Sequence, residues 1–206
     1  MEILLQYFPN LTDTQQKQFK DLETLVKSWN EKINLISRKD IANVIEHHIL
    51  HSLAIAKIIS FEPQTTIVDI GTGGGFPGLP LALFFPNIDF YLIDSIGKKI
   101  AVVNDIISKL GLSNVKAEQT RAENLKLKFD FVVSRAVTDI PTFVKFSRHL
   151  VSDKQRNAMP NGIFYLKGGN FSTELKQLKT HVELFDIHSM FKTEYFKEKK
   201  VVYIPF

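Results

Sequence analysis

The sequence predicts an α/β fold in which a doubly wound, mostly parallel sheet follows a helical extension. Apolar residues in the first sixty or so positions recur at helical spacings, whereas short apolar segments alternate with helical segments after Pro63. A cluster of glycines directly follows the first of these predicted strands, where open α/β sheets bind ligands. We therefore divide the chain into an extension, residues 1–62, and an α/β domain, residues 63–206.

The extension is predicted to contain two amphipathic helices. Thr12 and Gln15 have the spacing of a capping box at the start of the first helix. Its apolar face, with intervals of three and four, consists of Phe19, Leu22, Leu25, Val26, Trp29 and Ile33. This pattern places Trp29 in the core rather than on a base-stacking surface. The second helix is expected to open at Asp40, an N-cap residue, with apolar residues Ile41, Val44, Ile45, Ile49 and Leu53 on one side.

The α/β domain is predicted to alternate strands with helices. Strands are expected at residues 66–70, 88–94, 115–119, 129–134 and 163–166. Helices are expected to start at Gly78, to run from 98 to 110 with Gly111 as the C′ residue, and to form near 141–150 and 171–181. Residues 200–204 are expected to form a last, antiparallel strand at the edge of the sheet.

The composition excludes several classes of protein. The chain has 206 residues and no cysteine, so it has no disulfide, no cysteine-ligated zinc and no cysteine nucleophile. No apolar run is long enough to span a membrane, and the N-terminus lacks the cationic flank of a signal peptide. We therefore expect a cytoplasmic protein. The net charge of +4 is compatible with an anionic partner but does not identify one.

The segment from Asp69 to Gly78 is the strongest local motif. Counted from Gly73, it satisfies the G-x-G-x-x-G pattern of dinucleotide sites, so a dinucleotide remains an alternative. Two acidic residues favour S-adenosylmethionine instead. Asp69 precedes the glycines, and Asp94 closes the second strand, where a carboxylate can accept both ribose hydroxyls.

Two further clusters follow later strands. Arg121-Ala122-Glu123 comes after the third strand, where backbone and a small side chain commonly flank an adenine ring, although a solvated turn would look the same. Ser134-Arg135-Ala136 comes after the fourth strand, so Arg135 is expected to point into the same crevice. If the cofactor is S-adenosylmethionine, the missing cysteine argues against methylation of pyrimidine carbon 5. The chain also lacks, after the fourth strand, the Asn/Asp-Pro-Pro-aromatic turn that is typical of enzymes that methylate exocyclic amines, which argues against that reaction. A purine ring nitrogen such as guanine N7 remains, which has no proton to lose and needs no general base.

The motifs together resemble the RsmG (GidB) family of bacterial small-subunit ribosomal RNA methyltransferases. The matching blocks are residues 69–81, 94–99, 121–123, 134–136 and 167–168, with 29–35 and 48–50 in the extension. The resemblance implies a Rossmann-like S-adenosylmethionine-dependent methyltransferase fold, with a mostly parallel seven-stranded sheet whose last strand is antiparallel. It also implies methylation of N7 of guanine 527 in the 530 loop of 16S rRNA, in the 30S subunit or an assembly intermediate. Nothing in the sequence demands more than a monomer.

The resemblance also implies which residues act. Positions that match cofactor contacts of the family are Gly71, Phe76, Ala122, Glu123 and Arg135, and Asp94 matches the ribose-binding acid. The glycine motif adds Asp69, Gly73 and Gly75 to the predicted cofactor site. Arg135 would orient the methionine end or the target base, without a general base. Asn34 and Lys167 match motif positions that we expect to face the substrate.

Other interpretations remain open at this point. One is an NAD-dependent oxidoreductase, which does not explain the clusters at 121–123 and 134–136. Another is an RNA-binding chaperone of ribosome assembly that keeps a cofactor pocket. His47 and His51 lie four residues apart, but no third ligand is evident and we expect no metal. The lysines near the C-terminus could face RNA or merely protect a sheet edge; these are Lys192, Lys197, Lys199 and Lys200.

Overall fold

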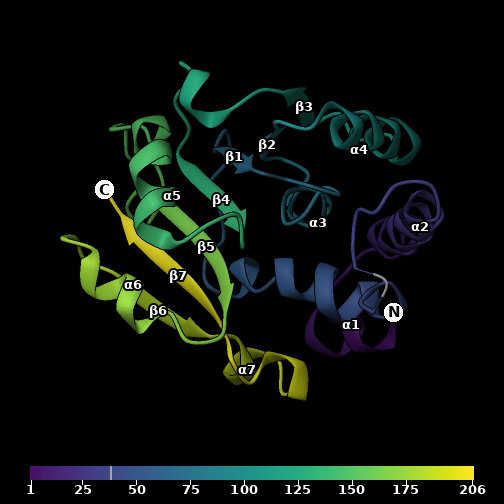
Figure 1. The fold of residues 1–206 in the computed structure, drawn as a ribbon. Coiled ribbons are helices and arrows are strands. Elements are labelled where there is room, and N and C mark those ends of the chain that lie inside the picture. The colour runs from purple at the N-terminus through teal and green to yellow at the C-terminus, as the bar shows by residue number, and fades with distance from the viewer. Residues whose placement is uncertain (38) are drawn as a thin grey trace.

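The computed structural model describes residues 1–37 and 39–206 and confirms the α/β fold. Its seven-stranded sheet has the order β3-β2-β1-β4-β5-β7-β6 (Figure 1). The strands are β1 (Thr66–Ile70), β2 (Asp89–Asp94), β3 (Val115–Gln119), β4 (Phe131–Arg135), β5 (Gly162–Gly168), β6 (Glu183–Asp186) and β7 (Lys199–Pro205). Strands β1 to β5 pair in parallel, whereas β7 is antiparallel to both β5 and β6. Within the described ranges, no helix is long and apolar enough to cross a membrane.

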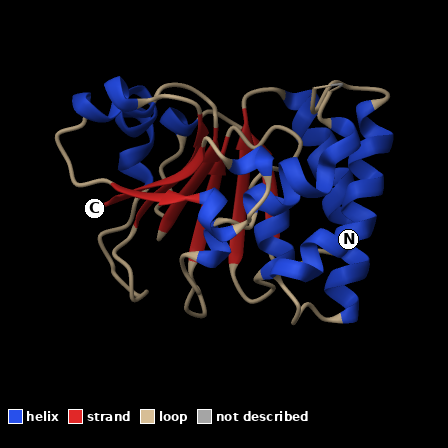
Figure 2. Ribbon diagram, turned by 90° about the horizontal axis from the view of Figure 1, so that it is seen from below, coloured by secondary structure: helices blue, strands red, loops and turns tan. Residues whose placement is uncertain are grey.

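Helices cover both faces of the sheet (Figure 2). Successive residues of a strand point to opposite faces, so alternation assigns each side chain to one layer. On β4, Phe131 and Val133 belong to the core that the N-terminal helices share, and Val132 belongs to the core on the opposite face. The same alternation decides which layer each candidate site residue can reach.

The N-terminal extension begins with α1 (Glu2–Tyr7) and α2 (Asp13–Asn30). The capping box of α2 is confirmed, because Thr12 Oγ1 accepts a hydrogen bond from the Gln15 amide and the Gln15 side chain accepts one from the Thr12 amide. Trp29 is half-buried and packs against the core, and its Nε1 donates to Asp105 Oδ2 at 2.7 Å. Helix α2 is therefore docked on the α/β domain by both apolar and polar contacts.

The second predicted helix of the extension differs in type. Ile41–Asn43 (η1) and Ile55–Lys57 (η3) are 3₁₀ turns, and Val44–Leu50 (η2) is a π-helix. Asp40 precedes the segment as predicted but makes no cap; its carboxylate bonds to Ser37 Oγ and His47 Nδ1, at 2.7 and 2.9 Å. The prediction of a capped α-helix was wrong because an apolar pattern shows which residues are buried, not which amide bonds to which carbonyl.

The helices of the α/β domain largely follow the prediction. Helix α3 (Gly78–Phe84) starts at the predicted residue, and α4 (Gly97–Leu110) is followed by Gly111 as its cap, with a φ of 64°. The remaining helical elements are the 3₁₀ turn η4 (Ala122–Asn124), α5 (Ile140–Ser147), the 3₁₀ turn η5 (Arg148–Leu150), α6 (Ser172–Gln177), α7 (Ile187–Met190) and the 3₁₀ turn η6 (Glu194–Phe196). Helix α6 is shorter than the predicted segment 171–181, because the backbone becomes extended at Leu178.

The C-terminal strand is antiparallel, as predicted, but it does not lie at the edge of the sheet. Strand β7 lies between β5 and β6, and β6 forms the edge. The sequence predicted no strand at Glu183–Asp186, a four-residue segment in which Glu183 and Leu184 are exposed. A short, half-polar edge strand has a weak hydrophobic pattern.

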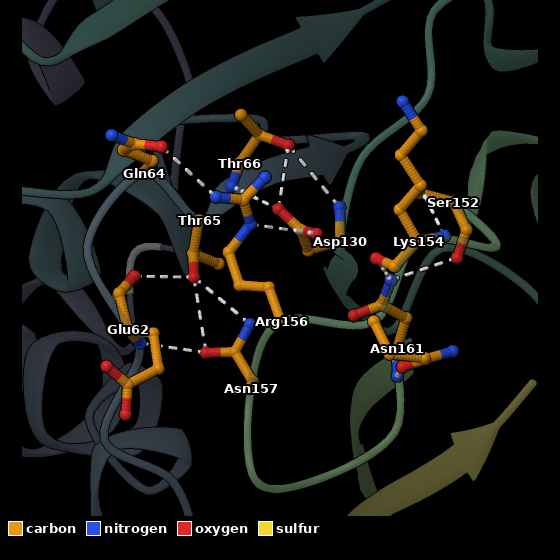
Figure 3. A network of polar contacts seen from close by, with 11 residues as sticks. Glu62, Gln64, Thr65, Thr66, Asp130, Ser152, Lys154, Arg156, Asn157 and Asn161 are labelled. Carbon is orange, nitrogen blue, oxygen red and sulfur yellow. Dashed lines mark hydrogen bonds and ion pairs between the residues drawn. The ribbon is translucent and has the colours of Figure 1, made fainter.

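A polar network lies at the amino ends of β1 and β4 (Figure 3). Asn157 Oδ1 accepts a hydrogen bond from the Glu62 amide at 2.8 Å. Asp130 Oδ2 accepts one from the Thr66 amide at 2.8 Å, and Asp130 Oδ1 lies 3.6 Å from Arg156 Nε. The loop before β5 thereby holds the segment that joins the extension to β1, at the end of the strands opposite the glycine loop.

Candidate functional site

The loop between β1 and α3 commits most of its amides to bonds within the protein. The donors are the amides of Gly71, Thr72, Gly73, Gly75, Phe76 and Gly78. Their acceptors, at 2.8 to 3.0 Å, are the carbonyls of Ile93 and Thr72 and the carboxylates of Asp69 and Asp94. The loop is therefore a closed turn, and it has little donor capacity left for a phosphate group.

Asp69 lies beneath this loop. Strand alternation directs its side chain toward α3, where Oδ2 accepts hydrogen bonds from Thr72 Oγ1 at 2.6 Å and from the Gly78 amide at 2.8 Å. The residue is fully buried, and burial raises the pKa of its carboxyl to about 7. Asp69 thus ties the start of the loop to the start of α3.

Asp94 lies at the carboxyl end of β2 and connects two turns. Its Oδ2 accepts a hydrogen bond from the Gly73 amide at 3.0 Å, and its Oδ1 accepts one from the Ile96 amide at 2.9 Å. Lys99 Nζ lies 4.0 Å from Oδ2. Because each carboxylate oxygen has a second lone pair, Asp94 can also accept from a ligand in the adjoining cleft.

The cleft measures about 500 Å³ and lies at the carboxyl ends of the parallel strands. Of the predicted cofactor residues, it is lined by Gly71, Gly73, Phe76, Asp94, Ala122, Glu123 and Arg135. Asp69 and Gly75 are buried and do not line the cleft. The structure therefore brings together residues from four separate sequence blocks.

The cleft also contains residues that the sequence analysis did not select. Phe146 of α5, Val137 after β4 and Leu35 of the extension all line it. Phe146 does not belong to any motif that the sequence analysis recognised. It lies one helical turn after Phe143, and this apolar spacing directs α5 toward the sheet. Leu35 belongs to the block 29–35, whose glycine-loop contact was not predictable from spacing.

Asn30 explains how Leu35 reaches the cleft. Its Oδ1 accepts hydrogen bonds from the amides of Leu35 and Ile36, at 2.8 and 2.9 Å, and so closes the turn after α2. A side chain at Gly74 would lie 3.3 Å from Leu35 Cβ, so the turn packs closely on the glycine loop. The predicted Asn34 is exposed and lines a separate recess with its neighbours in the turn.

Arg135 is the last residue of β4 and contacts the extension as well as the cleft. It follows the alternation of Phe131 and Val133, so its side chain leaves the sheet on the face of the N-terminal helices. Nη1 donates to the His47 carbonyl at 3.3 Å, and Nη2 lies 2.8 Å from His48 Nδ1. The guanidinium carbon is 5.3 Å from the centre of the Phe76 ring.

Lys167 points to the face of the sheet opposite to that of Arg135, because it alternates with Leu166, which lies on the face of the N-terminal helices. Its Nζ forms an ion pair with Glu174 Oε2 at 2.6 Å and donates to the Thr138 carbonyl at 3.4 Å. Glu174 also accepts from the Ile140 amide, so the pair holds the segment after Arg135. The structure does not bring Lys167 into the lining of the cleft.

The histidines of the extension and the lysines near the C-terminus, which the sequence analysis also singled out, make contacts within the protein. His47 bonds to Asp40 and stacks on Tyr195 with 3.5 Å between ring centres. Within the described ranges, no group of three or more potential metal-binding side chains occurs. Among the C-terminal lysines, Lys197 and Lys200 form ion pairs with Glu194 and Asp186, and Lys199 lies over the Tyr195 ring.

A model of the family described as rRNA small subunit methyltransferase G (GidB) matches residues 15–202. The chain belongs to this family. The resemblance inferred from the sequence blocks is thereby confirmed.

Relatives that carry the name ribosomal RNA small subunit methyltransferase G are similar over nearly their full length. The protein from Flavobacterium johnsoniae is 54% identical over 205 residues, which cover 100% of this chain and 98% of the relative. The protein from Phocaeicola vulgatus is 52% identical over 204 residues, which cover 99% of this chain and 98% of the relative.

Solved structures show the same fold at low identity. M. jannaschii TYW2 in complex with AdoMet has a TM-score of 0.58 and 16% identity, over 80% of this chain and 78% of that chain. A SAM-dependent methyltransferase from Aquifex aeolicus has a TM-score of 0.54 and 17% identity, over 74% of this chain and 88% of that chain. The fold of this family member is thus shared with S-adenosylmethionine-dependent methyltransferases, as the sequence predicted.

Proposed function

We propose that this protein transfers a methyl group from S-adenosylmethionine to N7 of guanine 527 in the 530 loop of 16S rRNA. The observation that carries the proposal is the cleft at the carboxyl ends of β1, β2 and β4, with the Asp94 carboxylate in its wall. Membership of the rRNA small subunit methyltransferase G family supports the reaction class and the RNA substrate. The positive net charge of +4 suits an anionic partner.

The cleft fits S-adenosylmethionine better than a dinucleotide. A pyrophosphate needs free amides at the start of a helix, but the Gly78 amide at the start of α3 already donates to Asp69. The loop amides are likewise committed within the protein. S-adenosylmethionine has no phosphate and needs none of these donors. An NAD-dependent oxidoreductase is therefore the weaker alternative.

The proposed roles follow the order of the strands. The sheet places the end of β3 beside β2, β2 beside β1, and β1 beside β4. A nucleoside with its ribose hydroxyls on Asp94 would extend its adenine toward Ala122, Glu123 and Phe146. The methionine end would then cross the glycine loop, at the backbone of Gly71 and Gly73, and reach Arg135.

The residues of the cleft need only to bind, orient and exclude water. S-adenosylmethionine supplies an electrophilic methyl group, and guanine N7 has an in-plane lone pair with no proton to remove. We assign Arg135 to orienting the methionine end or the target base, and no residue to general base catalysis. Asp69 and Gly75 would act by shaping the loop. Asn34 and Lys167 stay predicted substrate contacts. The exposure of Asn34 supports its prediction, whereas Lys167 already pairs with Glu174.

The proposal is tested with methyl-labelled S-adenosylmethionine and small ribosomal subunits from a strain that lacks its own rRNA small subunit methyltransferase G. We expect label in a 16S rRNA fragment as 7-methylguanosine. We further propose that the protein acts in the cytoplasm as a monomer. Cofactor binding without label would exclude guanine N7 in this particle and leave the RNA chaperone. Binding of NAD instead of S-adenosylmethionine would contradict the cofactor.

Asp94→Asn provides the matched variant for that assay. The substitution removes one acceptor oxygen at the proposed ribose site, so we expect affinity for S-adenosylmethionine to fall about tenfold or more. Asp89→Asn is the control, because Asp89 is exposed at the opposite end of the same strand. Calorimetric titration of both variants measures the difference. Equal affinities would remove Asp94 from the binding site.

A further inference from the structure

His48 lies in the π-helix of the extension, directly beside Arg135. Its Nδ1 is 2.8 Å from Arg135 Nη2. A guanidinium N–H can only donate, so Nδ1 accepts and the ring proton of His48 is on Nε2. Within the described ranges, Nε2 is buried without a hydrogen-bond partner, so the bond to Arg135 is the polar contact of the ring.

The His48 ring is also neutral. Burial, followed by the positive charge of Arg135, lowers the pKa of His48 to about 3. A neutral imidazole accepts from the guanidinium without adding a like charge beside it. The centre of the His48 ring lies 5.2 Å from the centre of the Phe76 ring, and Phe76 lines the cleft. His48 therefore contacts both the arginine and the glycine loop that we assign to the cofactor.

The helical backbone around His48 is held by a second element. The His47 carbonyl accepts hydrogen bonds from Arg135 Nη1 and from the Tyr195 hydroxyl, both at 3.3 Å. The His47 ring stacks on Tyr195, which precedes β7. The extension thus presents two fixed acceptors to Arg135, one on the backbone and one on the His48 ring.

We propose that His48 is a positioning residue, which holds the Arg135 guanidinium so that its remaining donors face the cleft. Arginine has five N–H donors, and two of them are used by His47 and His48, neither of which lines the cleft. Two fixed acceptors restrict the rotamers of a long side chain before any ligand arrives, which lowers the entropic cost of binding. The inference rests on the proposed function, because it gives Arg135 a ligand in the cleft.

The test compares three variants of the full chain. His48→Leu removes the acceptor and fills the buried position with an apolar side chain. His48→Asn retains an acceptor oxygen close to the position of Nδ1. His51→Leu is the matched control, because His51 is buried in the next turn and, within the described residues, neither ring nitrogen has a partner. Calorimetric titration gives the affinity for S-adenosylmethionine, single-turnover assays give the transfer rate, and urea unfolding gives stability.

We expect His48→Leu to lower affinity or transfer rate about tenfold, with substantial rescue in His48→Asn and no change in His51→Leu. In an Arg135→Ala background, His48→Leu should have no further effect, because its role passes through the arginine. In the ¹⁵N spectrum of the histidine rings, Arg135→Ala should shift the His48 Nδ1 resonance.

Two results would overturn the inference. The first is a His48→Leu protein that binds and transfers like His51→Leu while the wild type is active. The second is an equal loss from His48→Leu with and without Arg135. Failure of the proposed function is a different outcome, since the wild-type protein would then neither bind S-adenosylmethionine nor transfer methyl. The Nδ1 resonance still tests the contact itself, because it needs no cofactor.

Discussion

Gly75 and Gly111 both have a left-handed backbone, with φ values of 95° and 64°, but their surroundings differ. A Cβ at Gly75 would collide with Leu79 Cδ1 and lie 2.7 Å from its Cγ, and Leu79 is fully buried. A Cβ at Gly111 meets nothing within 4 Å. The glycine loop therefore needs Gly75 for space as well as for conformation.

We expect Gly111→Ala to lower the free energy of unfolding by about 1 kcal/mol, from backbone strain alone. Gly75→Ala adds a collision with Leu79, so we expect a loss of about 3 kcal/mol and weaker cofactor binding. Urea unfolding of both variants measures the difference. Equal losses would mean that α3 moves freely to accept the methyl group.

The turn after α2 offers a comparison at the scale of an element, between Asn30 and Asn34. Asn30 closes the turn through the amides of Leu35 and Ile36, whereas Asn34 is exposed on it. Asn30→Ala should lower the free energy of unfolding by about 1–2 kcal/mol and weaken cofactor binding, because Leu35 loses its support beside Gly74. Denaturant unfolding and calorimetric titration measure both effects.

Asn34→Ala is the control for the turn and also tests the predicted substrate contact. Its unfolding free energy should stay within about 0.5 kcal/mol of the wild type. If Asn34 faces RNA, transfer to ribosomal subunits should fall while affinity for S-adenosylmethionine stays the same. Unchanged transfer would show that the asparagine at position 30, rather than the one at 34, gives this block its role.

Buried elements could be predicted from the sequence and marginal ones could not. The central strands, such as β1 and β4, are covered on both faces, so their apolar runs are unambiguous. Strand β6 exposes half its residues and therefore lacks such a run. The π-helix was missed because an apolar pattern does not show which amide bonds to which carbonyl.

The candidate site was predictable where a residue type is tied to a strand end. Asp94 and Gly73 were identified in this way and meet at 3.0 Å. The partner of Arg135 was not identifiable, because the contact with His48 joins residues 87 positions apart. Phe146 reaches the cleft through packing, for which the sequence contains no motif, and Leu35 reaches it through the turn that Asn30 closes.

At the scale of the whole molecule, the extension and the sheet share one core. Phe19 and Val26 of α2 belong to the same cluster as Phe131 of β4 and Tyr203 of β7. The boundary predicted between residues 62 and 63 therefore separates two segments of sequence that are packed together. A shared core of this kind predicts that both segments unfold in a single transition.

Trp29 makes this testable, because it is the single tryptophan of the chain and lies in the extension against Asp105 of α4. We expect its fluorescence and the far-ultraviolet circular dichroism to change at the same urea concentration. Asn157→Ala should lower the free energy of unfolding by about 1–2 kcal/mol, since Asn157 holds the Glu62 amide at the junction. Both urea midpoints should therefore fall together. A fluorescence change at lower urea than the dichroism change would mean that the extension undocks first, and Asn157→Ala would then widen the gap. Affinity for S-adenosylmethionine should stay the same in this variant, because the junction lies at the end of the strands opposite the cleft.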